Sequence, residues 1–406
     1  MVVTRNSRIR VLLVGPVPPP YGGIPTYVKQ LYEARIKGVD FSLFNTALPD
    51  WVAPLTREGK RHYQFMSENG FFTGLKILLY VLGSYPVFLL KIFMIRPQIV
   101  QVFTCSFWGY WRNWVYLLLA KLCQRKTIFH LLNAIDIFYS EVGKIQKKWL
   151  ERSLNSADTY LLQSPGLQRW VEKFSRRKVL GIWNGIDFDS IPIKGELPKF
   201  IAGLKMPIGI TVGSLGKNKG TYDILENLER MHSAGVKIGW IFVGGGNLRE
   251  FRDLAESKGL SNCVLFTGAI DEPLKWQYLH HADFFCLPSY AEGQPISILE
   301  AMAVGLPVIS TDIGSIPEIL NDGISARVIR TGDKRALEQA IRQIALDPDL
   351  RRRIAKEAFS VVKNRHDSKS LFPKLGKIYR ALVSYNENPD IEGHSVKIGE
   401  MVSMLK

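Results

Sequence analysis

Short apolar segments alternate with helical patterns along most of the chain, and this alternation restricts the possible fold more than any other feature. In the first half the strand-like segments are IRVLLVG, PQIVQVF, KTIFHL and DTYLLQS, at residues 9–15, 97–103, 126–131 and 158–164. Helical patterns such as WVYLLLAKLCQ and KIQKKWLERSL separate them. Alternating strands and helices favour a parallel sheet with helices on both faces.

The alternation starts again after residue 200. The strand-like segments there are MPIGITVG, IGWIFVG, CVLFTGA, ADFFCLP and LPVIST, at residues 206–213, 238–244, 263–269, 282–288 and 306–311. A chain of 406 residues is also too long for one comfortable core. We therefore predict two doubly wound α/β domains, joined within the turn-rich segment NGIDFDSIPIKGELP at residues 184–198.

Charge is distributed unevenly between the two halves of the chain. Residues 1–185 contain 25 Lys and Arg residues against 10 Asp and Glu residues, which gives +15 of the formal net charge of +16. Residues 186–406 contain 28 basic and 27 acidic residues. A basic half attracts nucleic acid, an anionic membrane surface or a phosphorylated substrate. Because no RNA- or DNA-binding motif is present, we expect no nucleic-acid partner.

The most apolar segment is FFTGLKILLYVLGSYPVFLLKIFMI, residues 71–95, which Gly83 and Pro86 interrupt. Lys76 and Lys91 leave 14 uncharged residues between them, fewer than the roughly 20 that a membrane-spanning helix needs. A core or interfacial helix is the better interpretation, and the sequence leaves the choice between these two open. The start of the chain, MVVTRNSRIR, is charged, so we expect no secretory signal peptide.

Two smaller features bear on location. The basic segment KIQKKWLERSL, residues 144–154, groups its cations beside Trp149 and is either a solvated face or a surface that rests on an anionic membrane. The cysteines show no metal-binding spacing, and we expect buried free thiols in a reducing compartment. They are Cys105, Cys123, Cys263 and Cys286.

Two glutamates, Glu292 and Glu300, lie eight positions apart within SYAEGQPISILEAMAVGLPVIST, residues 289–311. Pro295 suits the first position of a short helix, and Gly305 suits its C-terminal cap. Such a helix begins at the carboxyl edge of the sheet, where open α/β sheets bind ligands. Glu292 would lie in the loop at that edge, and Glu300 would point back to it, since helical side chains lean toward the N-terminus. The pair suits hydrogen bonds to a diol such as ribose; on spacing alone, a capping acid and a solvated helix acid remain the alternative.

The stretch EGQPISILEAMAVGLPVISTDIGSIPEIL resembles the E-x7-E signature of the retaining glycosyltransferases of family 4, or group 1 glycosyl transferases. The resemblance covers most of the chain, because further matching segments follow in order. They are the Gly22-Gly23 loop, His130 after a strand, SADTYLLQS, WNGID, VGSLGKNKG, FVGGG and LFTGAI.

The resemblance implies the GT-B fold, in which two Rossmann-like α/β domains face each other across a cleft. The N-terminal domain, at residues 1–185, would bind the acceptor, and the C-terminal domain, at residues 196–365, would bind the nucleotide sugar. A helix at residues 366–384 would return to the N-terminal domain, and residues 385–406 would form a loosely held tail.

The activity that the resemblance implies is transfer of a sugar, of the hexosyltransferase type, from a nucleotide diphosphate sugar with retained anomeric configuration. By analogy Glu300 binds the donor ribose, Glu292 faces the donor sugar, and Lys219 neutralises the diphosphate leaving group. His130 lies near the sugar and the reaction centre, although a lone histidine at a strand end is more often a satisfied structural residue.

Backbone groups complete the implied donor site. Gly22 and Gly23 let the N-terminal domain approach the diphosphate closely, and N–H groups after Glu292 hold the sugar hydroxyls and the diphosphate. The whole implied donor-binding set is Gly22, Gly23, Ser214, Lys219, Ile270, Glu292, Gly293, Gln294, Pro295, Ile296 and Glu300.

The sequence departs from the family pattern at one position, because Ser214 stands where relatives usually carry an arginine that faces the diphosphate. Lys217 or another nearby cation would have to replace that charge. We expect no metal and no cofactor, since lysines and helix N-termini supply positive charge; the only DxD-like segment near the domain join is DFD at residues 187–189, in the linker. No carboxylate stands out as a nucleophile, so the family resemblance suggests front-face attack.

These features favour a glycosyltransferase that acts on a lipid-linked or polysaccharide acceptor in cell-surface glycan biosynthesis. We expect a cytoplasmic protein, peripheral on the inner face of the plasma membrane, with an anionic membrane surface as a partner. The alternative is a sugar-nucleotide epimerase on the same scaffold, which would need no separate acceptor and would leave the basic N-terminal half unexplained.

Overall fold

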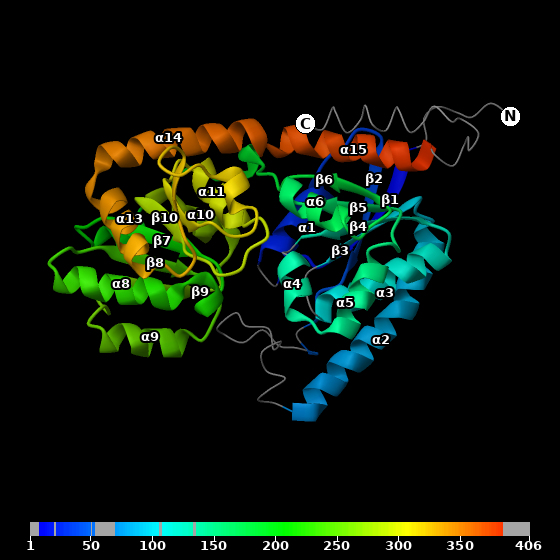
Figure 1. The fold of residues 1–406 in the computed structure, drawn as a ribbon, viewed down its shortest axis with the longest axis horizontal. Coiled ribbons are helices and arrows are strands. Elements are labelled where there is room, and N and C mark those ends of the chain that lie inside the picture. The colour runs from blue at the N-terminus through cyan, green and yellow to red at the C-terminus, as the bar shows by residue number, and fades with distance from the viewer. Residues whose placement is uncertain are drawn as a thin grey trace.

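The fold consists of two α/β domains that lie beside each other and are bridged by two consecutive helices (Figure 1). The computed structural model describes residues 8–19, 22–49, 51–52, 70–104, 108–132 and 135–384. Cys105 and the expected tail at residues 385–406 lie outside the described residues.

The first domain contains a six-stranded parallel sheet with the strand order β2-β1-β3-β4-β5-β6. Four of its strands coincide with the apolar segments expected from the sequence, and β2 and β6 are additional. The strands are β1 (Ile9–Gly15), β2 (Val39–Asn45), β3 (Ile99–Thr104), β4 (Lys126–Leu131), β5 (Thr159–Leu162) and β6 (Lys178–Gly181).

Helices cover both faces of this sheet, because alternate strand side chains point to opposite sides. One face packs against α1 (Gly23–Glu33) and, from the far end of the chain, α15 (Ser368–Ser384). The other packs against α2 (Gly70–Ile95), α3 (Trp108–Leu122), α4 (Ile135–Glu141), α5 (Lys144–Ser153) and α6 (Pro165–Glu172).

The second domain repeats the design with the strand order β12-β11-β10-β7-β8-β9, again all parallel. Its strands are β7 (Ile208–Val212), β8 (Gly239–Val243), β9 (Val264–Gly268), β10 (Phe284–Leu287), β11 (Val308–Thr311) and β12 (Ala326–Ile329), of which the sequence did not predict β12. Its helices are α7 (Lys199–Ala202), α8 (Thr221–Ser233), α9 (Leu248–Ser257), α10 (Glu272–His281), α11 (Ile296–Ala303), α12 (Ile316–Ile319), α13 (Lys334–Leu346) and α14 (Pro348–Arg365).

The C-terminal helix α15 leaves the second domain after α14 and packs on the first domain (Figure 1). The Tyr379 hydroxyl donates to Gln101 Oε1 of β3 at 2.6 Å, and the Phe372 ring meets the Tyr27 ring edge-on. At the turn between α14 and α15, His366 Nδ1 donates to the carbonyl oxygen of Asn184 in the linker. The chain therefore crosses between the domains twice, and a buried contact joins the two crossings.

Helix α2 corrects the expectation that the apolar part of residues 71–95 is too short to span a membrane. Gly83 and Pro86 do not end it, and the residues from Gly74 to Ile95 form one stretch of 22 residues that is long and apolar enough to cross a membrane. Only 22% of its most apolar window is buried, so it is not simply a core helix.

One side of α2 packs on the first domain and the other is exposed. The packed side chains are Ile77, Val81, Phe88 and Ile92. The exposed ones are Phe72, Leu75, Leu78, Leu79, Leu82, Val87, Leu90, Phe93 and Met94.

Candidate functional site

Glu292 and Glu300 lie at the carboxyl edge of the second sheet, in the loop after β10 and in helix α11. Both side chains are buried, with 8% and 4% of their residue surfaces exposed. Pro295 is the N-terminal cap of α11 rather than its first residue, which corrects the sequence expectation by one position. Gly305 follows the helix with a φ of 77°, the left-handed conformation expected of a glycine there.

Each of the two glutamates is paired with a lysine. Lys219 Nζ donates to Glu292 Oε1 at 2.5 Å, and the Ser289 hydroxyl donates to the same oxygen at 2.7 Å. Lys275 Nζ donates to Glu300 Oε1 at 2.6 Å. All four side chains are largely shielded from solvent, so these ion pairs are screened less than surface pairs.

The lysines come from two different strand ends. Lys219 belongs to the 3₁₀ helix η3 (Lys217–Lys219), which follows β7, the sheet neighbour of β10. Lys275 lies in the first turns of α10, five positions after Ile270, which packs partly buried against the core. Sequence reasoning did not identify Lys275, because no spacing within the chain indicates that α10 lies beside α11.

Two glycines allow the loops around Glu292 to pack closely. Gly220, with a φ of 69°, has so little room that a Cβ there would lie 2.4 Å from the Pro288 carbonyl oxygen. Gly314, with a φ of 59°, would place a Cβ 2.1 Å from the carbonyl oxygen of Glu292. Any larger residue at either position would displace the loop that carries the glutamate.

The backbone after Glu292 makes contacts that the sequence did not indicate. The Gln294 N–H donates to Gln163 Oε1 of the first domain at 3.2 Å, and the Gly293 carbonyl accepts from the Ser315 hydroxyl at 2.6 Å. Pro295 has no N–H, so it cannot donate to a ligand. In this structure the expected row of free N–H groups is therefore reduced at Gln294 and Pro295.

Asn184 forms hydrogen bonds that connect the two domains. Its N–H donates to Gln294 Oε1 at 2.5 Å, and its side-chain amide donates to the Gln294 carbonyl at 3.0 Å. The Gln163 amide in turn donates to Asn184 Oδ1 at 3.1 Å. Linker, first domain and the loop of Glu292 are thus joined by one set of buried hydrogen bonds.

The Gly22-Gly23 loop of the first domain reaches the start of α11. Gly22 caps α1 and Gly23 is its first residue, and both are exposed. A Cβ on Gly23 would lie 3.9 Å from Ile296 Cδ1, the first residue of α11. The structure therefore brings together Gly22, Gly23 and Ile296 from the predicted set.

Ser214 and Lys217 are exposed in the loop after β7. Of the two lysines in this segment, Lys219 is the one that pairs with Glu292. The structure therefore does not bring Ser214 or Lys217 into the buried contacts of the two glutamates.

His130 is the most deeply buried member of the predicted set. It lies near the end of β4, has no exposed surface, and its ring meets Tyr27 of α1 edge-on at 5.3 Å between ring centroids. Burial lowers the pKa of its imidazole to about 3, so the ring is neutral near pH 7. Its Nδ1 is 3.1 Å from Gln101 Nε2, and its Nε2 has no partner among the described residues.

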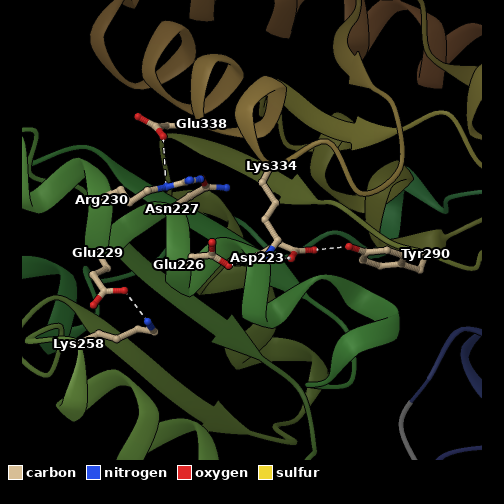
Figure 2. A network of polar contacts seen from close by, with 9 residues as sticks. All are labelled: Asp223, Glu226, Asn227, Glu229, Arg230, Lys258, Tyr290, Lys334 and Glu338. Atoms are coloured by element: carbon tan, nitrogen blue, oxygen red, sulfur yellow. Dashed lines mark hydrogen bonds and ion pairs between the residues drawn. The ribbon is translucent and has the colours of Figure 1, made fainter.

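Polar contacts within the second domain hold the loop that carries Glu292 in place (Figure 2). The Tyr290 hydroxyl, two residues before Glu292, donates to Asp223 Oδ2 of α8 at 2.9 Å. Lys334 of α13 pairs with Asp223 and with Glu226. The contacts through Asp223 and Lys334, which sequence reasoning missed, tie the loop to two helices. The other side chains in Figure 2 pair among themselves, Glu229 with Lys258, and Arg230 with Asn227 and Glu338.

The DFD segment at 187–189 does not gather a metal site among the residues that the structure describes. Asp187 caps the short helix η2 (Phe188–Ser190), and Asp189 pairs with Lys369 at 2.5 Å. Within the described ranges, no group of three His, Cys, Asp or Glu side chains could hold a metal ion.

Comparisons with known proteins agree with this geometry. Residues 198–361 match the family model described as "Glycosyl transferases group 1". Phosphatidyl-myo-inositol mannosyltransferase of Mycobacterium leprae (strain TN) is 24% identical over 261 residues, or 63% of this chain and 67% of that protein. Lipopolysaccharide core biosynthesis glycosyltransferase LpsE of Rhizobium meliloti (strain 1021) is 25% identical over 201 residues, or 50% of this chain and 58% of that protein.

The alignments therefore span only about three fifths to two thirds of these relatives, 58% and 67% of their lengths. Solved structures cover more of the chain and show its fold. Sucrose-phosphate synthase from Thermosynechococcus elongatus has a TM-score of 0.71 at 19% identity and covers 93% of this chain and 100% of that chain. Anabaena Alr3699/HepE in complex with UDP-glucose has a TM-score of 0.68 at 16% identity and covers 92% and 100%.

The family model matches the domain that holds Glu292, Glu300, Lys219 and Lys275, and the solved structures match both domains. From these matches, together with the two parallel sheets, residues 198–361 belong to the group 1 glycosyl transferase family, family 4, and the whole chain has the GT-B fold.

Proposed function

We propose that this protein transfers a sugar from a nucleoside diphosphate sugar to a lipid-linked or polysaccharide acceptor, with retention at the anomeric carbon. The observation that carries the proposal is the arrangement of Glu292 and Glu300. Both carboxylates are buried at one sheet edge, and each has a lysine within hydrogen-bond distance. Such an edge offers acceptors for sugar hydroxyls and cations for a diphosphate.

The ion pairs suggest how a donor would bind. A diphosphate carries more negative charge than one carboxylate, so Lys219 would exchange Glu292 for the donor's phosphate oxygens. Glu292 would then accept a hydrogen bond from a hydroxyl of the donor sugar. The Ser289 hydroxyl would continue to donate to Glu292 Oε1. Glu300, held by Lys275, would accept from the ribose hydroxyls.

In the proposed reaction the acceptor hydroxyl attacks the anomeric carbon from the side that the diphosphate leaves. The bond from this carbon to the phosphate oxygen breaks while the bond to the acceptor oxygen forms. The acceptor proton passes to a phosphate oxygen of the leaving diphosphate, so the sugar needs no covalent intermediate on the protein. Lys219 stabilises the departing charge, which is the main electrostatic contribution expected of such a site.

The fold likeness to HepE bound to UDP-glucose supports a nucleoside diphosphate sugar as the donor class. The names of the relatives, a phosphatidyl-myo-inositol mannosyltransferase and a lipopolysaccharide core glycosyltransferase, support a lipid-linked or glycan acceptor.

We further propose that the protein lies on the cytoplasmic face of the plasma membrane, held there by the first domain. Helices α2 and α5 contribute to the same core cluster and so cover the same face of the first sheet. The exposed side chains of α2 are apolar, and α5 exposes Trp149 beside Lys144, Lys148 and Arg152. Near α5, a surface hollow is lined by Glu151, Arg152, Asn155, Phe174, Arg176 and Arg177. Apolar side chains flanked by cations suit an anionic lipid surface, where each cation contributes about 1 kcal/mol.

The test is a donor screen with extracted membrane lipids as acceptors. Purified protein is incubated with a panel of radiolabelled nucleoside diphosphate sugars, with and without the lipid extract and with and without EDTA. Label should appear in lipid only with one donor and only when acceptor is present, and EDTA should not abolish it. Conversion of the donor to an isomer without acceptor would instead identify an epimerase, and loss with EDTA restored by magnesium or manganese would indicate a metal requirement.

A further inference from the structure

A buried line of hydrogen bonds connects the C-terminal helix to His130. It passes from Tyr379 of α15 to Gln101 of β3, over 2.6 Å, and from Gln101 to His130 of β4, over 3.1 Å. None of the three residues has exposed surface. The line therefore joins residue 130 to a helix that the chain reaches only after it has completed the second domain.

The direction of the hydrogen bonds is set by Tyr379. Burial raises the pKa of its hydroxyl well above the usual value, so it keeps its proton. That proton is donated to Gln101 Oε1, which turns the Gln101 amide nitrogen toward His130 Nδ1. With the amide reversed, the Tyr379 hydroxyl would have no acceptor among the described residues, at a cost of about 1–3 kcal/mol for a buried donor.

The tautomer of His130 follows from this direction. Since the Gln101 amide nitrogen can only donate, His130 Nδ1 must accept, and the single proton of the neutral ring lies on Nε2. This Nε2 is buried and has no acceptor among the described residues. A buried donor without an acceptor is uncommon, and a role in binding or catalysis is one of the reasons for which such a group is kept.

Packing holds the ring in the same orientation. Tyr27 of α1 meets His130 edge-on, and Phe372 of α15 meets Tyr27 edge-on, with 5.3 Å and 6.5 Å between ring centroids. Helix α15 thus supports the imidazole in two ways, through Gln101 and through Tyr27.

We propose that Tyr379 is a positioning residue, which acts through Gln101 to keep the His130 proton on Nε2, so that His130 donates a hydrogen bond to an oxygen of the donor or acceptor and does not act as a general base. The role at the substrate rests on the proposed function. The tautomer does not, because the contacts that set it lie entirely within the chain.

The tautomer can be measured directly on the free protein by NMR with ¹⁵N-labelled histidine. The His130→Gln variant assigns the His130 signals among those of the seven histidines. We expect the wild type to hold the Nε2–H form. Tyr379→Phe should release the Gln101 amide and give a mixture of both forms. A wild type with the proton on Nδ1 would overturn the proposal.

A matched control is Tyr110→Phe. Tyr110 is also a fully buried tyrosine of this domain, but its hydroxyl bonds to Ser153 on the other face of the sheet. This variant should leave the His130 signals unchanged. If Tyr379→Phe does not fold, Gln101→Leu tests the same line and should also lose the preference for Nε2–H. An unchanged tautomer in a folded Tyr379→Phe or Gln101→Leu protein would refute the positioning role.

Kinetics then tests the consequence for the reaction. With the donor found in the screen, Tyr379→Phe should lower kcat roughly 5- to 15-fold and leave the donor KM nearly unchanged, as expected for one misdirected hydrogen bond. A protein that holds the Nε2–H form but transfers no sugar would contradict the proposed function and not the positioning role. Normal kcat in a Tyr379→Phe protein with a mixed tautomer would remove His130 from the reaction.

Discussion

Lys219 Nζ lies 2.5 Å from Glu292 Oε1, so the cation expected to face a diphosphate is neutralised by the loop carboxylate when no donor is bound. The two residues come from loops 73 positions apart that follow neighbouring strands of one sheet. Each of the two charges can be buried because the opposite charge lies beside it, since an isolated buried charge would destabilise the fold.

Stability should depend on the two residues as a pair. Lys219→Met leaves the buried carboxylate with only Ser289 as a partner and should destabilise the fold by about 1–3 kcal/mol. Adding Glu292→Gln should restore most of that loss. Chemical denaturation of both single variants and the double variant measures the coupling.

The more exposed pair of Lys334 and Glu226 serves as the control. Their side chains are 42% and 39% exposed. The same comparison of two single variants and the double variant should therefore give a coupling energy of about 0–1 kcal/mol for this pair. Equal coupling energies for the two pairs would contradict the claim that burial strengthens the interaction between Lys219 and Glu292.

Glu300 should govern donor affinity. Glu300→Ala removes a charged acceptor for the ribose hydroxyls and should weaken nucleoside diphosphate binding roughly 10- to 150-fold, as expected for a hydrogen bond to a charged group. Calorimetry with uridine, guanosine and adenosine diphosphates measures the change. The matched variant Glu229→Ala removes a glutamate that also pairs with a lysine, Lys258, outside the site. Equal loss in both variants would remove Glu300 from the donor site.

The His366 imidazole should make the fold sensitive to acid. Burial lowers its pKa from the usual 6.5 to about 4. Because the folded value lies below the unfolded one, the unfolded chain binds the proton first as the pH falls. This contribution to the free energy of unfolding is therefore constant above about pH 6.5 and decreases as the pH falls toward 4.

His366→Gln isolates this contribution, since glutamine keeps an N–H donor for the Asn184 carbonyl but does not titrate. Denaturation is measured at several pH values between about 7 and about 4. The free energy of unfolding should decrease less steeply with falling pH for the variant than for the wild type. Parallel curves would mean that the histidine is protonated equally easily in both states.

The two sides of α2 should respond differently to substitution. Changing exposed Leu79, Leu90 and Phe93 together to Gln should leave the protein folded but reduce its sedimentation with anionic vesicles. Phe88 has no exposed surface, and Phe88→Ala should cost about 3–5 kcal/mol of stability. If the triple variant unfolds, or binds vesicles as the wild type does, the exposed face of α2 is not a membrane surface.

The sequence was sufficient to predict most strands and the place of the two glutamates. Continuous apolar segments such as IRVLLVG are typical of strands buried on both faces, and β1 is buried over nearly all of its length. Strand β2 was missed because VDFSLFN mixes polar residues into an edge strand that is only partly buried. Strands β6 and β12 have four residues each and lie at sheet edges, where the apolar pattern is weakest.

The contacts of the site could not be predicted from the sequence, for a physical reason. Lys275 meets Glu300 only because the fold brings the start of α10 to α11, and Gln163 meets Gln294 only because the domains are in contact. Local spacing contains no information on either. The length of α2 was underestimated for a different reason, since the count stopped at Lys76 and Lys91, whereas the helix continues past both lysines.

The most direct test of the account is the stereochemistry of the product. With the donor and acceptor found in the screen, NMR of the first product formed gives the anomeric configuration of the new linkage. An α-linked donor should yield an α-linked product, and the same transfer should fall strongly in Glu292→Gln while Glu229→Ala transfers at the wild-type rate. A product of inverted configuration, or full transfer by Glu292→Gln, would contradict the assignment of this site as that of a retaining glycosyltransferase.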